Sequence, residues 1–177
     1  MLHRLSNRIL LLTLLAVLMC MLTACRSSRH ASGIDYSLLA RSGIKLGMDV
    51  EADDNHTLMV EAASWIGTPY RYGGNTRKGA DCSGMVSAVY RQVFQTVLHR
   101  SSADMYKHDC RHISRGALRQ GDLVFFAPPR SRIPNHVGIY LKNGRFIHTS
   151  SSKGVIVSHL DEAYYKKHWL GGGRVKD

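Results

Sequence analysis

DCSGMVSAVYRQVF, residues 81–94, is the stretch that decides the fold. Its apolar residues recur at the spacing of a helix that is buried on one side. Asp81 is a typical N-cap residue, so the stretch predicts a helix from Cys82 to Phe94. A cysteine in the first turn lies near unpaired backbone N–H groups and the positive end of the helix dipole, which lower the pKa of a thiol. The charge of Asp81 opposes that effect, and most helical cysteines are small core residues, so the helix alone does not make Cys82 a nucleophile.

The segments on either side of this helix predict an α+β domain. Residues 58–66 have the pattern of another helix, ended by Gly67 and Pro69. Residues 95–119 are polar and predict irregular structure with a helical turn near 103–107. Further on, the period changes to that of short strands, which we expect at 123–127, 136–141, 145–149 and 155–157. Helices followed by a small antiparallel sheet are typical of the α+β class.

Two histidines lie on the predicted hairpin, and its loop decides whether they can meet. A two-residue loop at Asn143-Gly144 would pair residue 139 with residue 148 and place His136 and His148 on opposite faces. A three-residue loop that starts at Lys142, with Gly144 left-handed, would pair 138 with 148. The two imidazoles would then be diagonal neighbours on one face, roughly 7–8 Å apart at the backbone. We therefore predict the three-residue loop.

The N-terminus resembles the signal of a bacterial lipoprotein. Residues 9–22 form an apolar run behind two arginines, too short for a comfortable membrane span. The run ends at Leu22-Thr23-Ala24-Cys25, which resembles a lipobox in which Cys25 is acylated and becomes the first residue. Arg26 after the cysteine favours the outer membrane in that class, and an uncleaved anchor helix is the alternative. We expect a signal peptide at 1–24, a lipidated flexible tether at 25–56 and one domain at 57–177.

The net charge indicates which binding partners to expect, and the cysteines raise the question of a disulfide. The 177 residues carry a formal charge of +11, scattered along the chain, which draws a protein towards acidic polymers. Export to the periplasmic face of a membrane argues against nucleic acid and leaves peptidoglycan stems and anionic lipid headgroups. An oxidising compartment would permit a bridge between Cys82 and Cys110. We expect no such bridge, since nucleophilic chemistry needs Cys82 as a free thiol.

Taken together, the motifs of the domain resemble the NlpC-like cell-wall cysteine peptidases. The resemblance covers about 57–175 and includes Tyr164-Tyr165-Lys166-Lys167, which looks like the closing segment of the lipoprotein murein endopeptidases. It implies a papain-like core in which a nucleophile helix packs on a small antiparallel sheet. Five blocks carry it, in order and near-spacing: Gly67-Thr68-Pro69-Tyr70-Arg71-Tyr72-Gly73-Gly74, Asp81-Cys82-Ser83-Gly84, Gly121-Asp122-Leu123-Val124-Phe125-Phe126, His136-Val137-Gly138-Ile139-Tyr140 and Phe146-Ile147-His148.

The same resemblance implies roles for individual residues. Cys82 would be the nucleophile, His136 its base and His148 the residue that orients His136. Tyr70 would lie near the oxyanion, beside the backbone N–H of Cys82. No metal or organic cofactor is implied. Residues expected to line the substrate cleft are Asp81, Ser83 and one of Ser101 or Ser102.

The sequence is also compatible with other functions. The leading hypothesis is hydrolysis of an amide in peptidoglycan stem peptides or cross-links, at γ-D-glutamyl–diaminopimelate or diaminopimelate–D-alanine, by a monomer. An acyltransferase or amidase acting on another amide, and a non-catalytic peptidoglycan-binding lipoprotein, are the alternatives. A metal site is a minor alternative, since His108, Cys110 and His112 would share one side of an extended segment, with His99 as a fourth ligand.

Overall fold

The computed structural model describes residues 35–176. The expected signal peptide and Cys25 lie outside the described residues. Within residues 35–176, no helix has the length and apolar character needed to cross a membrane. The helical elements are α2 (Tyr36–Leu46), α3 (His56–Trp65), α4 (Cys82–Val93), α5 (Ser102–Asp104), the π-helical turn η2 (Met105–Asp109), the 3-10 turn η3 (Arg115–Ala117) and α6 (Ala163–His168).

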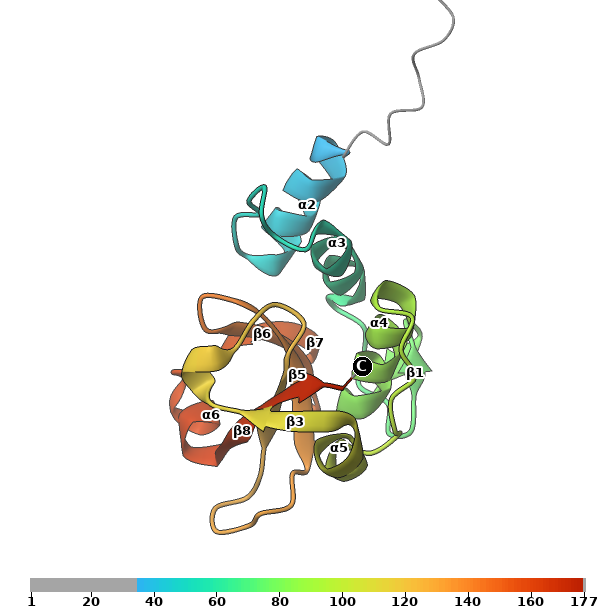
Figure 1. The fold of residues 1–177 in the computed structure, drawn as a ribbon. Coiled ribbons are helices and arrows are strands. Elements are labelled where there is room, and N and C mark those ends of the chain that lie inside the picture. The colour runs from blue at the N-terminus through green and yellow to red at the C-terminus, as the bar shows by residue number, and fades with distance from the viewer. Residues whose placement is uncertain (1–34, 177) are drawn as a thin grey trace, which may run out of the picture. The chain divides into compact units, whose positions relative to one another are not determined.

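A six-stranded antiparallel sheet forms the other half of the domain (Figure 1). Its spatial order is β3-β8-β4-β5-β6-β7, so the C-terminal strand β8 lies between β3 and β4. A separate two-stranded hairpin, β1 (Asn75–Thr76) with β2 (Gly79–Ala80), precedes α4. The sheet strands are β3 (Cys110–Ile113), β4 (Leu123–Phe126), β5 (His136–Lys142), β6 (Arg145–Ser150), β7 (Gly154–His159) and β8 (Trp169–Val175).

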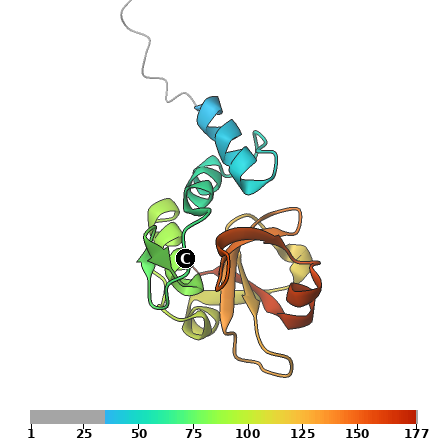
Figure 2. The same ribbon diagram turned by 180° about the vertical axis from the view of Figure 1, so that it is seen from behind.

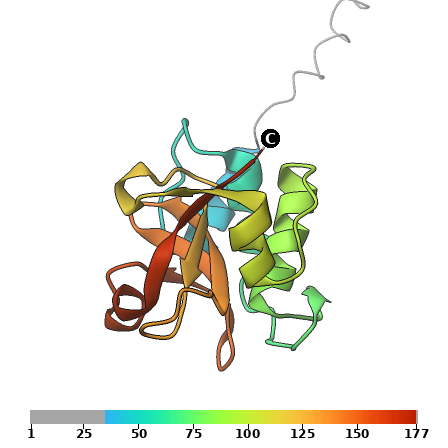
Figure 3. The same cartoon turned by 60° about the horizontal axis from the view of Figure 1, so that its bottom comes forward.

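Helix α4 packs on the sheet and forms the main core (Figure 3). Met85, Val86 and Val89 are fully buried in one cluster with Ile139 and Ile147 of the sheet. Helix α3 packs beside α4, and α2 packs on α3. The connection between β4 and β5 extends past the end of the sheet (Figure 2). This layout confirms the expected α+β class, with helix α4 packed on an antiparallel sheet.

A second, smaller core lies under α6. Phe126 and Phe146 are buried there together with Val124 and Leu160, and the ring of Tyr165 packs against them. Side chains of one strand alternate between the two faces of the sheet. Each face of the sheet therefore has an apolar cluster of its own.

The register predicted for the histidine hairpin is correct, but the loop is not. Gly138 pairs with His148, as expected. The turn nevertheless has two residues, Asn143 and Gly144, both with positive φ, which is the pattern of a type I′ turn. The extra residue is Leu141, which lies in a bulge of β5 where the register shifts between Tyr140 and Lys142. A bulge therefore moves the register by the same single residue that a longer loop would have moved it.

Three other segments differ from expectation. Residues 36–46, inside the expected flexible tether, form helix α2, whose buried Leu39 and Leu46 face the domain. Residues 110–113, expected to be irregular, form strand β3 because they pair with β8. Strand β8 itself was not predicted, since its run of three glycines, 171–173, is typical of a turn.

Gly84 is required by close packing of the loop before α4. A Cβ atom at this position would lie 2.0 Å from the carbonyl oxygen of Gly74. We expect Gly84→Ala to lower the free energy of unfolding by about 2 kcal/mol or more, since the backbone must shift. Gly116→Ala is the matched control, because its Cβ would meet nothing within 4 Å, and it should stay within about 0.5 kcal/mol of wild type. Equal effects of the two variants in urea denaturation would contradict this packing argument.

Candidate active site

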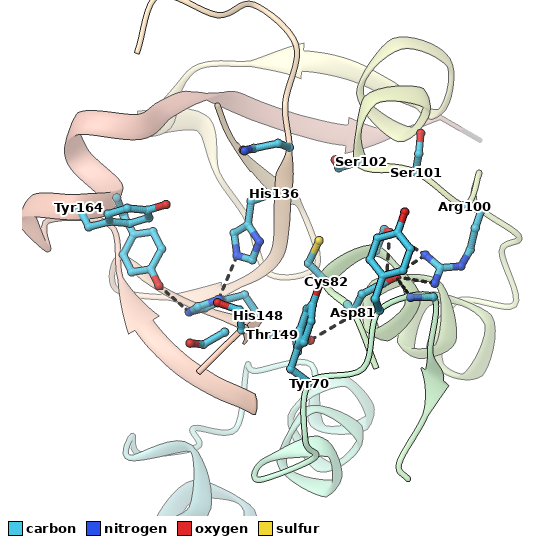
Figure 4. Close-up of a pocket in the computed structure, with 17 residues that line it drawn as sticks. Tyr70, Asp81, Cys82, Arg100, Ser101, Ser102, His136, His148, Thr149 and Tyr164 are labelled. Atoms are coloured by element: carbon cyan, nitrogen blue, oxygen red, sulfur yellow. Dashed lines mark hydrogen bonds and ion pairs between the residues drawn. The ribbon is translucent and has the colours of Figure 1, made fainter. Parts of the chain in front are cut away.

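An open cleft of about 780 Å³ lies where the start of α4 meets β5 and β6 (Figure 4). Its walls come from the loop before β1, the start of α4, the segment around α5, the start of β5, the end of β6 with the turn that follows it, and helix α6. The structure brings all of the site residues predicted within the described part of the chain into this one cleft: Tyr70, Asp81, Cys82, Ser83, Ser101, Ser102, His136 and His148.

Cys82 opens helix α4, and its sulfur lies beside the strand that carries His136. Asp81 caps the helix, since its Oδ1 accepts a hydrogen bond of 2.7 Å from the N–H of Gly84. The backbone N–H of Val137, the residue after His136, lies close enough to the Cys82 sulfur to lower the pKa of the thiol. Among the hydrogen bonds of residues 35–176, none joins this sulfur to the His136 ring, although both face the same cleft (Figure 4). Catalytic hydrogen bonds often tighten only when substrate is bound.

The expectation of a lowered thiol pKa is wrong for this resting structure. Burial raises the pKa of Cys82, and the nearby charge of Asp81 raises it further. Hydrogen bonds from backbone N–H groups, that of Val137 first, lower the pKa but do not outweigh burial. The helix start therefore supplies donors, as expected, while desolvation of the charged form dominates. Cys82 rests as a neutral thiol.

His136 and His148 form a hydrogen-bonded pair of neutral imidazoles. Nε2 of His136 lies 3.0 Å from Nδ1 of His148. Burial lowers the pKa of His136 to about 4. Burial, followed by the proximity of His136, lowers the pKa of His148 to about 3. Because Nε2 of His136 is hydrogen-bonded to His148, Nδ1 of His136 is the ring nitrogen that is left to interact with the thiol of Cys82.

Arg100 belongs to the cleft and was not predicted. Its guanidinium holds Asp81 with two hydrogen bonds, of 2.9 Å to Oδ1 and 2.7 Å to Oδ2, and also donates to the hydroxyl of Ser83. Burial alone would raise the pKa of Asp81, but hydrogen bonds from Arg100 and Gly84 outweigh it and lower that pKa. Arg100 stands 19 residues from Asp81, so spacing gives no signal. The available signal is that Arg100 immediately precedes Ser101, an expected cleft residue.

The remaining predicted cleft residues are held by structural contacts. Ser101 caps α5, where its hydroxyl accepts from the N–H of Asp104. Ser102 is buried, and its hydroxyl donates to the carbonyl of Pro134 just before β5. Tyr70 is anchored through its backbone bridge to Ala80 while its side chain, 41% exposed, faces the cleft. These contacts place the three residues on the walls of the cleft that contains Cys82.

The side chains of the histidine-rich segment are held by other contacts. Cys110 is a buried free thiol in β3. Cys82, which is half-buried at the start of α4, is also a free thiol. His112 stacks on Tyr106, and His99 is bound to Asp109 at 2.6 Å. Across residues 35–176, no three histidine, cysteine or acidic side chains are grouped so that they could hold a metal ion.

Comparisons with known proteins agree with this geometry. The model of the NlpC/P60 family matches residues 67–174. The chain is 39% identical to the murein DD-endopeptidase MepS/murein LD-carboxypeptidase of Escherichia coli K12 over 84% of this chain and 73% of that protein. It is 45% identical to the probable endopeptidase NlpC of the same strain, over 63% of this chain and 72% of that protein.

A solved structure shows the same fold. It is the lipoprotein-like NLP/P60 family protein of Staphylococcus aureus, which superposes with a TM-score of 0.60 at 30% identity. The match covers 72% of this chain but only 45% of that structure. This chain therefore spans less than half of that structure.

The buried neutral imidazoles predict a loss of stability in mild acid. The unfolded chain takes up protons on His136 and His148 near pH 6.5, while the folded state resists protonation down to about pH 4 and about pH 3. The unfolded state thus binds more protons, so the free energy of unfolding must fall as pH drops from 6.5 to 4, by up to about 1.4 kcal/mol per pH unit for each imidazole.

Urea denaturation between pH 7 and pH 4 measures this slope. His148→Asn should make it shallower, while His56→Asn, which alters an exposed contact to a backbone carbonyl, is the matched control. The same slope in wild type and His148→Asn would contradict the assignment of a buried neutral imidazole.

Proposed function

The chain belongs to the NlpC/P60 family, and on that premise we propose that it is a cysteine endopeptidase that cuts amide bonds in the peptide stems or cross-links of peptidoglycan. Cys82 is the nucleophile, His136 the base and His148 the residue that orients the base. The observation that carries the proposal is the 3.0 Å bond between the two imidazoles beside a thiol contacted by Val137 N–H. A binding module would have no use for this arrangement.

The neutral resting state makes His136 a general base. As the sulfur attacks the scissile carbonyl carbon, Nδ1 of His136 takes the thiol proton, so charge develops only when substrate is present. The imidazolium formed donates through Nε2–H to Nδ1 of His148, which accepts the bond. The alternative of a preformed thiolate is disfavoured because burial raises the pKa of Cys82 and lowers that of His136.

Other groups of the cleft stabilise the oxyanion of the tetrahedral intermediate, and His136 completes the reaction. The backbone N–H of Cys82 at the start of α4 and the phenol of Tyr70 are the donors proposed for the tetrahedral oxygen. Collapse of the intermediate breaks the C–N bond, and the leaving amine takes the proton from His136. A water molecule then attacks the thioester on Cys82 and gives a proton to His136. The C–S bond breaks, the new carboxyl group is released, and His136 returns the proton to the sulfur.

We propose a diaminopimelate–D-alanine cross-link as the bond in preference to γ-D-glutamyl–diaminopimelate. The relative that matches the longest part of this chain among those described above carries the name of a DD-endopeptidase. The Asp81–Arg100 pair provides opposite charges side by side on one wall, which suits a zwitterionic stem peptide with both amine and carboxylate groups. Anchoring through a lipid on Cys25, in the outer membrane, remains our expectation for how the domain is held near its polymer.

The nucleophile is tested by replacing each thiol of the domain in turn. We expect Cys82→Ala to abolish cleavage of purified cross-linked muropeptides, by about 10⁴-fold or more, since no other group can form the acyl-enzyme. Mass spectrometry of the products identifies the bond. Cys110→Ala is the matched control and should retain activity, because this buried thiol lies in β3 outside the cleft. Residual cleavage in Cys82→Ala, or binding without cleavage by wild type, would overturn the proposal.

The pH dependence of kcat/KM tests the state of the base. A general base must be neutral, so activity falls as pH drops through the pKa of His136. Burial lowers this pKa to about 4, and we therefore expect the acid limb near pH 4, well below the ordinary 6.5. Enzyme held at each pH and returned to pH 7 controls for unfolding. An acid limb between pH 6 and pH 7 would contradict a buried neutral imidazole.

A further inference from the structure

The ring of His148 makes contacts on its far side that the three proposed catalytic residues leave unexplained. Its Nε2 lies 3.0 Å from the hydroxyl of Tyr165 and 3.1 Å from the hydroxyl of Ser158. Tyr165 belongs to α6 and Ser158 to β7, so two separate elements converge on one nitrogen. His148 is only 1% exposed, so water cannot easily replace either partner. In Figure 4, a dashed line marks the hydrogen bond with the phenol on the side of His148 that faces away from His136.

The protonation of this nitrogen decides whether His136 can act as a base. Neutral His148 carries its proton on Nδ1 or on Nε2. If Nδ1 of His148 carries the proton, it donates to Nε2 of His136. Neutral His136 must then carry its own proton on its Nδ1, and this Nδ1 cannot accept the proton of the thiol. If Nε2 carries it, Nδ1 of His148 accepts from His136, and Nδ1 of His136 faces Cys82 unprotonated. Only the second arrangement is productive.

Two hydroxyls around Nε2 favour the productive arrangement. An unprotonated Nε2 has a single lone pair, so it could accept from only one of the two hydroxyls and would face the oxygen of the other. A protonated Nε2 can share its N–H between both oxygens, as bifurcated hydrogen bonds do. Ser158 also contacts Tyr165 through a side-chain hydrogen bond that, against the larger effect of burial, lowers the pKa of the phenol, so the two hydroxyls lie together beside Nε2.

The aromatic cluster under α6 fixes Tyr165 independently of its hydroxyl. The Tyr165 ring packs at 4.9 Å on Phe146 and at 5.1 Å on Phe126, between ring centroids. Phe146 in turn stacks on the His148 ring at 5.0 Å. Replacing Tyr165 with phenylalanine should therefore keep the packing and remove only the acceptor oxygen.

We propose that Tyr165 and Ser158 are positioning residues, whose hydroxyls accept Nε2–H of His148 and thereby keep its Nδ1 free to accept from His136. The inference rests on the proposed function, since it concerns the base of that reaction. The two hydroxyls act on His136 through His148, to whose Nε2 both are bonded. Each can serve as the acceptor when the other is absent, so their effects are not independent.

Long-range ¹H–¹⁵N NMR of the histidine rings tests the inference on the resting protein without substrate. In wild type we expect His148 to be protonated on Nε2, with its signals assigned by their loss in His148→Asn. In Tyr165→Phe combined with Ser158→Ala, we expect a mixed or Nδ1-protonated His148. Wild-type His148 protonated on Nδ1, or an unchanged tautomer in the double variant, would overturn the inference.

Kinetics on a cross-linked muropeptide give the second readout. We expect each single variant to lower kcat by about 3-fold and the double variant by about 30-fold or more, with KM within about 2-fold of wild type. Tyr90→Phe loses another buried phenol hydrogen bond, to the carbonyl of Gly121, and should keep kcat, so it controls for lost stability. An unchanged kcat in the double variant would overturn the inference while leaving a Cys82-dependent hydrolase intact. Cleavage that survives in Cys82→Ala would instead overturn the proposed function.

Discussion

A single bulged residue in β5 sets the geometry on which the site depends. Leu141 shifts the pairing so that Gly138, and not Ile139, lies opposite His148. Since side chains alternate between faces along a strand, a shift of one residue would place His136 and His148 on opposite sides of the sheet. With the bulge, their imidazoles share a face and meet at 3.0 Å. The buried Leu141 side chain is fixed in the main core, which holds the bulge in place.

Burial then determines how the chemistry can begin. His148 is buried, while His136 and Cys82 are half-buried, and the loss of hydration favours the neutral form of all three at neutral pH. Asp81 is a charged group next to the thiol, and its charge would oppose any thiolate. Arg100 balances that charge through two hydrogen bonds, so Asp81 can cap α4 at a lower electrostatic cost to Cys82. The proton therefore moves from sulfur to His136 only as the carbonyl is attacked.

Much of this fold was predictable from local patterns, and the failures have specific physical causes. The apolar stripe of α4 and the hairpin signal around Asn143-Gly144 are local, and both elements were predicted correctly, although the length of the hairpin loop was not. Strand β8 exists because β3 and β4 pair with it on either side, a tertiary constraint that its glycines conceal. Helix α2 is short, and its packing on α3 stabilises it more than propensity does.

The same distinction holds for the site. Cys82, His136 and His148 could be proposed because each stands in a recognisable motif, whereas Arg100 and the hydroxyls of Ser158 and Tyr165 reach the site from distant segments. The raised pKa of Cys82 could not be predicted either, because the helix start suggests the opposite sign and only the folded packing shows how completely the thiol is desolvated.

The central claim is that His148 acts only through His136, and a double-mutant cycle on kcat/KM tests it most directly. Cleavage of a cross-linked muropeptide is measured for wild type, His136→Ala, His148→Ala and the combination of both. We expect His148→Ala to cost about 100-fold in the wild-type background and less than about 2-fold once His136 is absent. The same factor in both backgrounds would show that the two imidazoles act independently and would contradict the mechanism.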